Sequence, residues 1–239
     1  MKPKSVLLGL LMFVALGAVG AATFVLLWHE PDFYQRSSIP EGRERQLEAG
    51  EFIGEFGMFV DKVQHEEPWD ARFTEKAINS YFDESFVPSG VAQRVLPEGV
   101  SRPRISIEPE RIRLAFRYGT GLMTTVVSID LRVWVAAQER NVVALELQGL
   151  HAGALPISAQ TLQQRVTDMA RPQNIDVTWY RHKGNPVALL RFQADRPRPT
   201  VHLKQIELRR GFITIRGSST EPPTLGAMLP FRADRSDSE

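Results

Sequence analysis

Residues 111–135 read RIRLAFRYGTGLMTTVVSIDLRVWV and carry the clearest structural signal in the chain. Apolar residues occupy every second position, first from Ile112 to Tyr118 and then from Val127 to Val135. A period of two is that of a β-strand, whose successive side chains point to opposite faces of a sheet. Because most of the intervening residues are polar, each strand is expected to have one apolar and one solvated face, which is typical of an antiparallel sheet.

The alternation extends outward in both directions along the chain. Ile105 and Ile107 alternate with polar residues before this stretch, and apolar residues again occupy alternate positions from Val143 to Leu147. Short connections at residues 108–110, 118–123 and 138–141 are typical of an antiparallel meander. A second group of four strands is predicted at residues 174–180, 186–193, 200–208 and 211–216. The sequence therefore predicts an α+β fold with a curled antiparallel sheet of about eight strands.

Two to three helices are predicted to pack against this sheet, at residues 43–66, 74–82 and 158–170. The first places Phe52, Phe56 and Phe59 on one apolar arc. Its glycines form a second stripe, which predicts close packing of the helix backbone on the sheet, with a ligand-facing edge as the alternative. In the second helix Asn79 is a candidate site residue, although an amide that bonds a neighbouring loop is the simpler interpretation. The stripe consists of Gly50, Gly54 and Gly57.

An apolar segment without a charged side chain runs from Ser5 to Trp28. As a helix it would span about 36 Å, enough to cross a hydrocarbon core of about 30 Å. Lys2 and Lys4 precede the segment and Glu30 follows it, which predicts a cytoplasmic N-terminus and an exported body. The segment is therefore predicted to be a transmembrane signal-anchor helix of a single-pass protein in the bacterial inner membrane.

A cleaved signal peptide is the alternative interpretation of this segment. Residues 17–22, GAVGAA, offer small side chains at a plausible cleavage spacing, but the apolar run continues to Trp28. Small residues four positions apart would also let two anchor helices pack into a homodimer. The predicted division of the chain is a cytoplasmic stub (1–4), the anchor (5–28), a linker (29–42), an extracytoplasmic α+β domain (43–217) and a partly disordered tail (218–239).

The composition excludes several classes of function. Lys and Arg number 29 against 28 Asp and Glu, with both signs interspersed, so nucleic-acid binding is not expected. The absence of Cys excludes thiol catalysis, Cys-ligated zinc and a lipoprotein cysteine. No HExxH, GxSxG or Walker A motif is present, and the five His lack metal-ligand spacing. Neither an enzymatic activity nor a cofactor is therefore predicted.

Two short segments carry a resemblance to known proteins. They are FTEKAINSYF at residues 73–82, with Ile78-Asn79 inside it, and LHAGALPIS at residues 150–158, with Gly153 to Ile157 as a turn into a helix. With this layout, residues 40–217 resemble membrane-anchored extracytoplasmic bacterial proteins of uncharacterised families. Such domains are similar to tubular lipid-binding (TULIP-like) domains, in which a curled sheet wraps a long helix around an acyl-chain groove. The resemblance implies lipid binding and supplies no catalytic residue.

The sequence supports two hypotheses for the function. In the first, the domain binds a membrane lipid or another apolar ligand at the membrane surface, and each buried methylene group contributes about 0.8 kcal/mol of affinity. In the second, the sheet is fully packed, and the chain is a structural or assembly protein of the cell envelope that contacts a protein partner. The groove of the first hypothesis would be lined by Phe52, Phe56, Phe59, Ile112, Leu114, Phe116, Ile129, Leu131 and Val133.

Overall fold

The computed structural model describes residues 18–65, 68–90, 92, 96–121, 123–137, 139–193 and 200–219, and over these residues the chain is α+β. Its helices are α2 (Asp32–Arg36), α3 (Arg43–His65), α4 (Glu75–Tyr81) and α6 (Gln160–Ala170), with a π-helical turn at Phe82–Phe86 and a 3-10 turn at Arg171–Gln173. Its strands are β1 (Trp69–Thr74), β2 (Val100–Glu108), β3 (Arg111–Thr120), β4 (Met123–Val135), β5 (Val142–Ala152), β6 (Leu155–Pro156), β7 (Ile175–His182), β8 (Asn185–Phe192), β9 (Val201–Arg209) and β10 (Phe212–Ser219).

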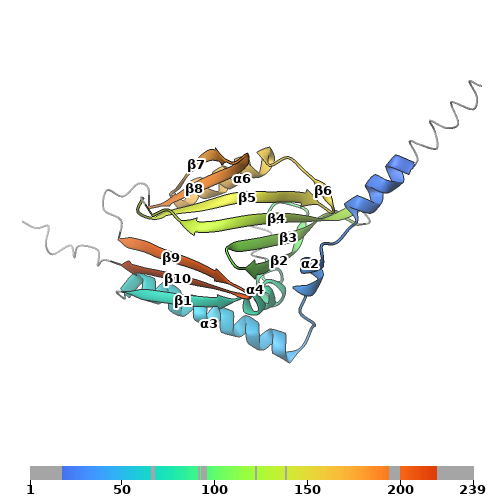
Figure 1. The fold of residues 1–239 in the computed structure, drawn as a ribbon. Helices are drawn as coiled ribbons and strands as arrows, with labels where there is room; N and C mark the ends of the chain where they lie inside the picture. The colour runs from blue at the N-terminus through green and yellow to red at the C-terminus, as the bar shows by residue number, and fades with distance from the viewer. Residues whose placement is uncertain are drawn as a thin grey trace, which may run out of the picture.

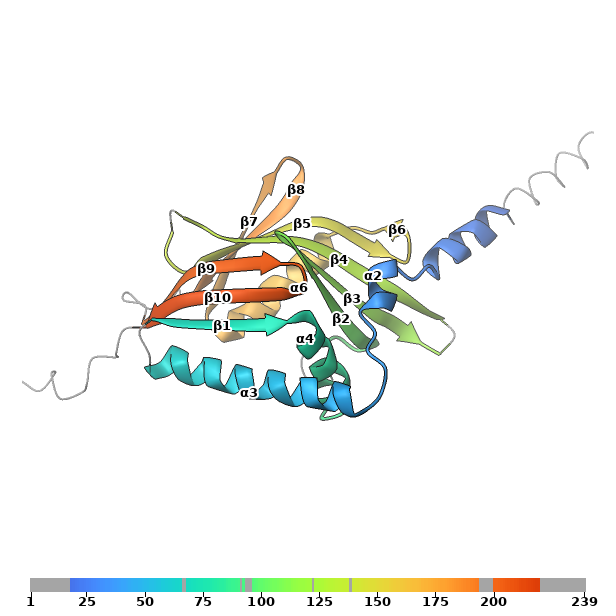
Figure 2. The same ribbon diagram turned by 60° about the horizontal axis from the view of Figure 1, so that its bottom comes forward.

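The strands form two antiparallel sheets instead of one. The small sheet has the order β1-β10-β9, and the large sheet has the order β2-β3-β4-β5-β8-β7 with β6 paired to β5. Figures 1 and 2 show α3 beside the small sheet on one side of the molecule and the β7–β8 hairpin on the other. The predicted single curled sheet is therefore wrong. Strand β10 pairs with β1 on one side and with β9 on the other. No strand was predicted at the residues of β1.

The structure also corrects the prediction of a membrane anchor. Among the described residues no helix is long and apolar enough to cross a membrane. Residues 18–27 are helical. The predicted transmembrane signal-anchor at residues 5–28 is wrong on this finding, and so is the single-pass inner-membrane topology drawn from it. Residues 5–17 lie outside the described residues.

The end of this helical stretch contacts the large sheet. The amide of Ala154 donates to the carbonyl oxygen of Leu26 over 2.8 Å, and the hydroxyl of Thr125 donates to that of Leu27. Gly153 makes this approach possible, because a Cβ at that position would lie 2.2 Å from the carbonyl oxygen of Leu26. Its φ of +60° also favours glycine.

The segment predicted as a linker contains helix α2, which packs on the large sheet. Phe33 and Tyr34 are buried against Ala115 and Val126. The hydroxyl of Tyr34 donates to the carbonyl oxygen of Arg102 over 3.0 Å. Because α2 occupies the arginine-bearing face of strands β3 and β4, that face is only partly solvated.

The opposite, apolar face of the large sheet packs against α6. Its core consists of side chains from β4 and β5, and side chains from β3, β4 and the start of α6 close around them. The buried residues are Val127, Ile129, Leu147 and Leu150, and the partly buried ones are Leu114, Phe116, Leu131, Ala159 and Leu162. This part of the apolar face is therefore a packed core.

The glycine stripe of α3 does not pack on a sheet. A Cβ at any of these positions would meet nothing within 4 Å, and all of them are exposed. Helix α3 instead packs on β1 and α4 through its aromatic arc, which turns the stripe to solvent. The predicted sheet contact of Gly50, Gly54 and Gly57 is therefore wrong.

Helix α4 joins the small sheet to the open edge of β2. The side-chain amide of Asn79 donates to the carbonyl oxygen of Ile105 over 2.8 Å and accepts from its N–H over 2.9 Å. The N–H of Ile107 donates to the carboxylate of Glu75 over 2.7 Å, and its carbonyl oxygen accepts from the N–H of Gly211 over 2.9 Å. These contacts satisfy the backbone of a β-sheet edge that is buried at this point. Asn79 thus bonds a strand, where the sequence had suggested a loop.

Replacing Asn79 by Leu is expected to destabilise the protein strongly. The change leaves both backbone groups of Ile105 without partners in a buried place, and each such group costs about 1–3 kcal/mol. Urea denaturation should therefore show a loss of about 2–5 kcal/mol in the free energy of unfolding. The control is Gln46→Ala on the exposed side of α3, which should change it little. Equal stability of Asn79→Leu and the wild type would contradict the bonding of this edge.

The contact of the N-terminal helix is tested by a pair of glycine substitutions. Gly153 and Gly121 have nearly the same φ, +60° and +58°, but a Cβ at Gly121 would meet nothing within 4 Å. Both Gly→Ala variants therefore carry similar backbone strain of about 1 kcal/mol, and only Gly153→Ala also collides with the backbone of Leu26. We expect Gly153→Ala to lower the free energy of unfolding by about 1–3 kcal/mol more than Gly121→Ala. Equal losses would show that residues 26 and 27 do not rest on this turn.

Candidate functional site

Helix α3 carries a row of aromatic side chains that faces the small sheet. The ring of Phe52 lies 5.6 Å from that of Phe73 and 4.8 Å from that of Tyr81. The ring of Phe59 lies 5.5 Å from that of Trp69 in an edge-on arrangement. Such aromatic pairs contribute about 0.5–1.5 kcal/mol each beyond the burial of their area. This row fixes α3 against β1 and α4.

An apolar pocket opens where this row ends, between the last two turns of α3, the small sheet and the end of β8. It has a volume of about 340 Å³. Phe59 and Val63 approach from the helix, Trp69 from β1 and Phe192 from β8. The lining residues are Phe59, Val60, Val63, Gln64, Trp69, Asn141, Phe192, Gln193, Val201, Leu203 and Ile215.

Two amide side chains in the pocket wall hold the small sheet to the large one. Asn141 donates to the carbonyl oxygen of Val201 over 2.5 Å and accepts from the N–H of Leu203 over 2.9 Å. The side-chain oxygen of Gln193 accepts from the N–H of Thr200 over 3.0 Å. These amides bond the start of β9 as another strand would, so their polar atoms are not free for a ligand.

The polar group of Trp69 is likewise engaged in hydrogen bonds. The indole N–H of Trp69 donates to the hydroxyl of Ser219 over 2.9 Å, and that hydroxyl donates to the carbonyl oxygen of Val63 over 2.6 Å. Among the described lining residues none is charged. The pocket therefore has the chemistry to bury an apolar group and lacks the charges needed to bind an ion.

Gly217 on β10 allows Trp69 to take its place in this wall. A Cβ at Gly217 would lie 2.2 Å from the indole ring and 2.5 Å from the carbonyl oxygen of His202. The register between β10 and β9 also shifts at this point. A strand glycine at an irregular register is typical of a close approach by another group, here the ring of Trp69.

The structure divides the predicted groove residues between two places. Those from β3 and β4 share the apolar face of the large sheet, where Ile112 pairs with Leu131 and Leu114 with Ile129. Those from α3 belong to the aromatic row, and Phe56 is 48 % exposed. Of the nine, Phe59 lines the apolar pocket, and Phe52, Phe56, Ile112, Leu114, Phe116, Ile129, Leu131 and Val133 do not.

Sequence reasoning missed most of the pocket wall. Trp69 lies on a strand of WDARFT, whose alternation of Trp69, Ala71 and Phe73 is the signal that could have found it. Phe192 and Leu203 lay on predicted strands, but nothing local indicated that their side chains meet. The pocket combines segments that are far apart in sequence, so it depends on the tertiary fold.

Comparisons with protein-family models, with curated proteins and with solved structures find no match to this chain. The resemblance to tubular lipid-binding domains therefore stays a prediction. Within the described part of the chain, no group of three or more His, Cys, Asp or Glu side chains could hold a metal ion.

The role of Asn141 can be tested at the amide that it bonds. Asn141→Gly keeps the left-handed backbone, for which φ is +58°, but removes the side-chain acceptor of the Leu203 N–H. Hydrogen exchange of the Leu203 amide should accelerate, and the free energy of unfolding should fall by about 1–3 kcal/mol. The amide of Leu208, which lies in the part of β9 paired with Ile213, serves as the internal control. Unchanged exchange at Leu203 would contradict the bond.

Proposed function

We propose that this protein binds the apolar chain of a lipid or a similar hydrophobic ligand in the pocket between α3, the small sheet and the end of β8. The observation that carries the proposal is the chemistry of the wall: aromatic and aliphatic side chains surround the space, and none of its described lining residues is charged. The amides of Asn141 and Gln193 already bond β9. A ligand here would gain affinity mainly from the removal of its apolar surface from water.

The size of the pocket limits what it can hold. Its volume of about 340 Å³ lies at the lower end of the range of about 300–1,000 Å³ typical of ligand pockets. At about 0.8 kcal/mol per methylene group, a few buried methylenes give measurable affinity. A short stretch of acyl chain, or one small hydrophobic molecule, therefore suits the space better than several complete chains.

The mouth of the pocket offers a route for the ligand. Val60, which lines the pocket, is 39 % exposed, and Gln64 is exposed one turn later. The side chain of Gln64 forms no hydrogen bond with the described residues, so its amide is available to a polar group at the ligand's end. A chain with one polar end would thus lie with its tail inside and its head near the end of α3.

The experiment is a binding titration with N-phenyl-1-naphthylamine, an uncharged fluorescent probe. Val60→Glu puts a charge into the pocket wall at a position exposed enough to keep the fold, and it should weaken probe binding at least tenfold. The control is Ile53→Glu on the same helix, where the side chain is 50 % exposed and outside the pocket lining. It should leave the dissociation constant within about twofold.

Either of two results would overturn the proposal. One is that the wild-type protein does not bind the probe, and the other is that both Glu variants lose binding equally. The second result would indicate adsorption to the exposed apolar surface of α3. Mass spectrometry of lipid extracted from the denatured, purified protein then identifies the natural ligand class.

A further inference from the structure

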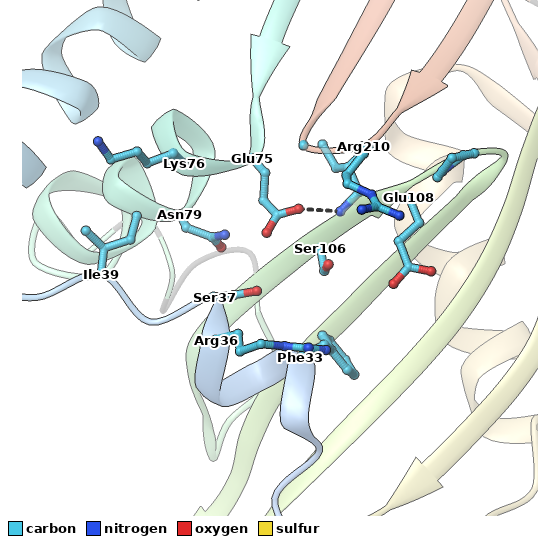
Figure 3. A pocket seen from close by; sticks show the side chains of 13 residues that line it. Phe33, Arg36, Ser37, Ile39, Glu75, Lys76, Asn79, Ser106, Glu108 and Arg210 are labelled. Atoms are coloured by element: carbon cyan, nitrogen blue, oxygen red, sulfur yellow. Dashed lines mark hydrogen bonds between the residues drawn. The ribbon is translucent and has the colours of Figure 1, made fainter.

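A second cavity lies at the opposite end of the small sheet, where α2, α4, β2 and the β9–β10 turn meet (Figure 3). Its volume is about 700 Å³, and it shares no lining residue with the apolar pocket. Both charged and aromatic side chains reach it, so its chemistry differs from that of the pocket. Its lining residues include Phe33, Arg36, Ser37, Glu75, Ser106 and Arg210.

Most of the negative charge near this cavity is already engaged. The carboxylate of Glu108 accepts from Arg111 over 2.7 Å and pairs with Arg113 at 3.0 Å. The hydrogen bond from Arg111 holds the pKa of Glu108 below its usual range. One oxygen of Glu75 accepts from the N–H of Ile107 over 2.7 Å. Of these carboxylates, only that of Glu75 has no cationic partner among the described residues.

Two guanidinium groups in the cavity have no such engagement. Arg36, from α2, and Arg210, from the β9–β10 turn, form no hydrogen bond or ion pair with the residues that the structure describes. Lys76 differs, because its ammonium group pairs with Glu44 and Glu48 on α3. Among its described lining residues the cavity therefore presents two guanidinium groups without a partner and one carboxylate without a cationic partner, that of Glu75.

These groups are arranged so that they can bind the oxygens of a single anionic ligand. Figure 3 shows Ser106 on β2 between Arg210, which comes from the β9–β10 turn, and Arg36, whose side chain lies beside Phe33. The hydroxyls of Ser37 and Ser106 form no hydrogen bond with described residues and can donate to the same oxygens. The ring of Phe33 adds an apolar wall.

We propose that this cavity binds a phosphate group carried by a small molecule. Guanidinium groups present several donors in a planar fork that matches the oxygens of a phosphate, and two of them can balance a dianion. The hydroxyls of Ser37 and Ser106 complete the donor set, while Phe33 contacts the carbon part of the ester. This site is separate from the apolar pocket, so phosphate binding is tested by its own measurement.

The test is isothermal titration calorimetry of the full chain with glycerol 3-phosphate and with inorganic phosphate, at an ionic strength held constant with chloride. The double variant Arg36→Gln/Arg210→Gln should weaken binding at least tenfold. The control Arg181→Gln/Arg209→Gln also removes two positive charges, but from exposed positions outside the cavity lining. It should leave the dissociation constant within about twofold. Binding of the uncharged probe in the apolar pocket should be unchanged in both variants.

A further arm distinguishes the source of the phosphate. Vesicles of phosphatidylcholine with phosphatidic acid replace the soluble ligands, and binding that is lost in Arg36→Gln/Arg210→Gln but kept in the control supports the site with a lipid headgroup as its ligand. The proposal is overturned if neither soluble phosphate nor vesicles bind. It is equally overturned if both double variants lose binding to the same extent, since that loss would reflect net charge alone.

Discussion

The arrangement of the molecule depends on side chains that satisfy the open backbone edge between its two sheets. The small and large sheets share no strand. At one end Asn79 and Glu75 bond the edge of β2, and at the other Asn141 and Gln193 bond the start of β9. A buried N–H or C=O without a partner is costly, so these amide and carboxylate groups hold the two sheets in one relative position.

Both candidate sites lie at these junctions. The apolar pocket is bounded by Asn141 and Gln193. The second cavity, which Arg36 and Arg210 line, is bounded by Glu75 and Asn79. Where side chains join two sheets, the backbones of the sheets are separated by the length of those side chains. Paired strands lie closer together, because their backbones bond each other directly, so more open space is left at a junction of this kind. The two spaces differ in chemistry because aromatic side chains of α3 and β1 reach one of them and guanidinium groups of α2 and the β9–β10 turn reach the other.

Local patterns predicted individual elements better than they predicted their partners. The alternation from Ile112 to Val135 places β3 and β4 correctly, and their register pairs Ile112 with Leu131. The apolar arc of residues 43–66 places α3. The same kind of reasoning failed for β9 and β10, which were predicted to belong to one curled sheet with all the other strands. The strand that joins them in the small sheet, β1, is the short segment WDARFT, whose alternation was not interpreted as a strand beside the predicted helix at residues 74–82. It also failed for α2, because PDFYQRSSIP has the Pro and Ser content of a linker although Phe33 and Tyr34 are buried.

The sequence by itself determined the α+β composition of the chain, the strands with one apolar face and the helix with an aromatic arc, because each depends on side-chain periodicity within one segment. Only the tertiary structure decided that there are two sheets, that the apolar face of β3 and β4 packs against α6, and that open space remains beside Trp69 and beside Arg36. These features depend on which backbone edges find partners across long distances in the chain. A single buried amide such as that of Asn79 settles such a pairing without leaving a pattern in the sequence.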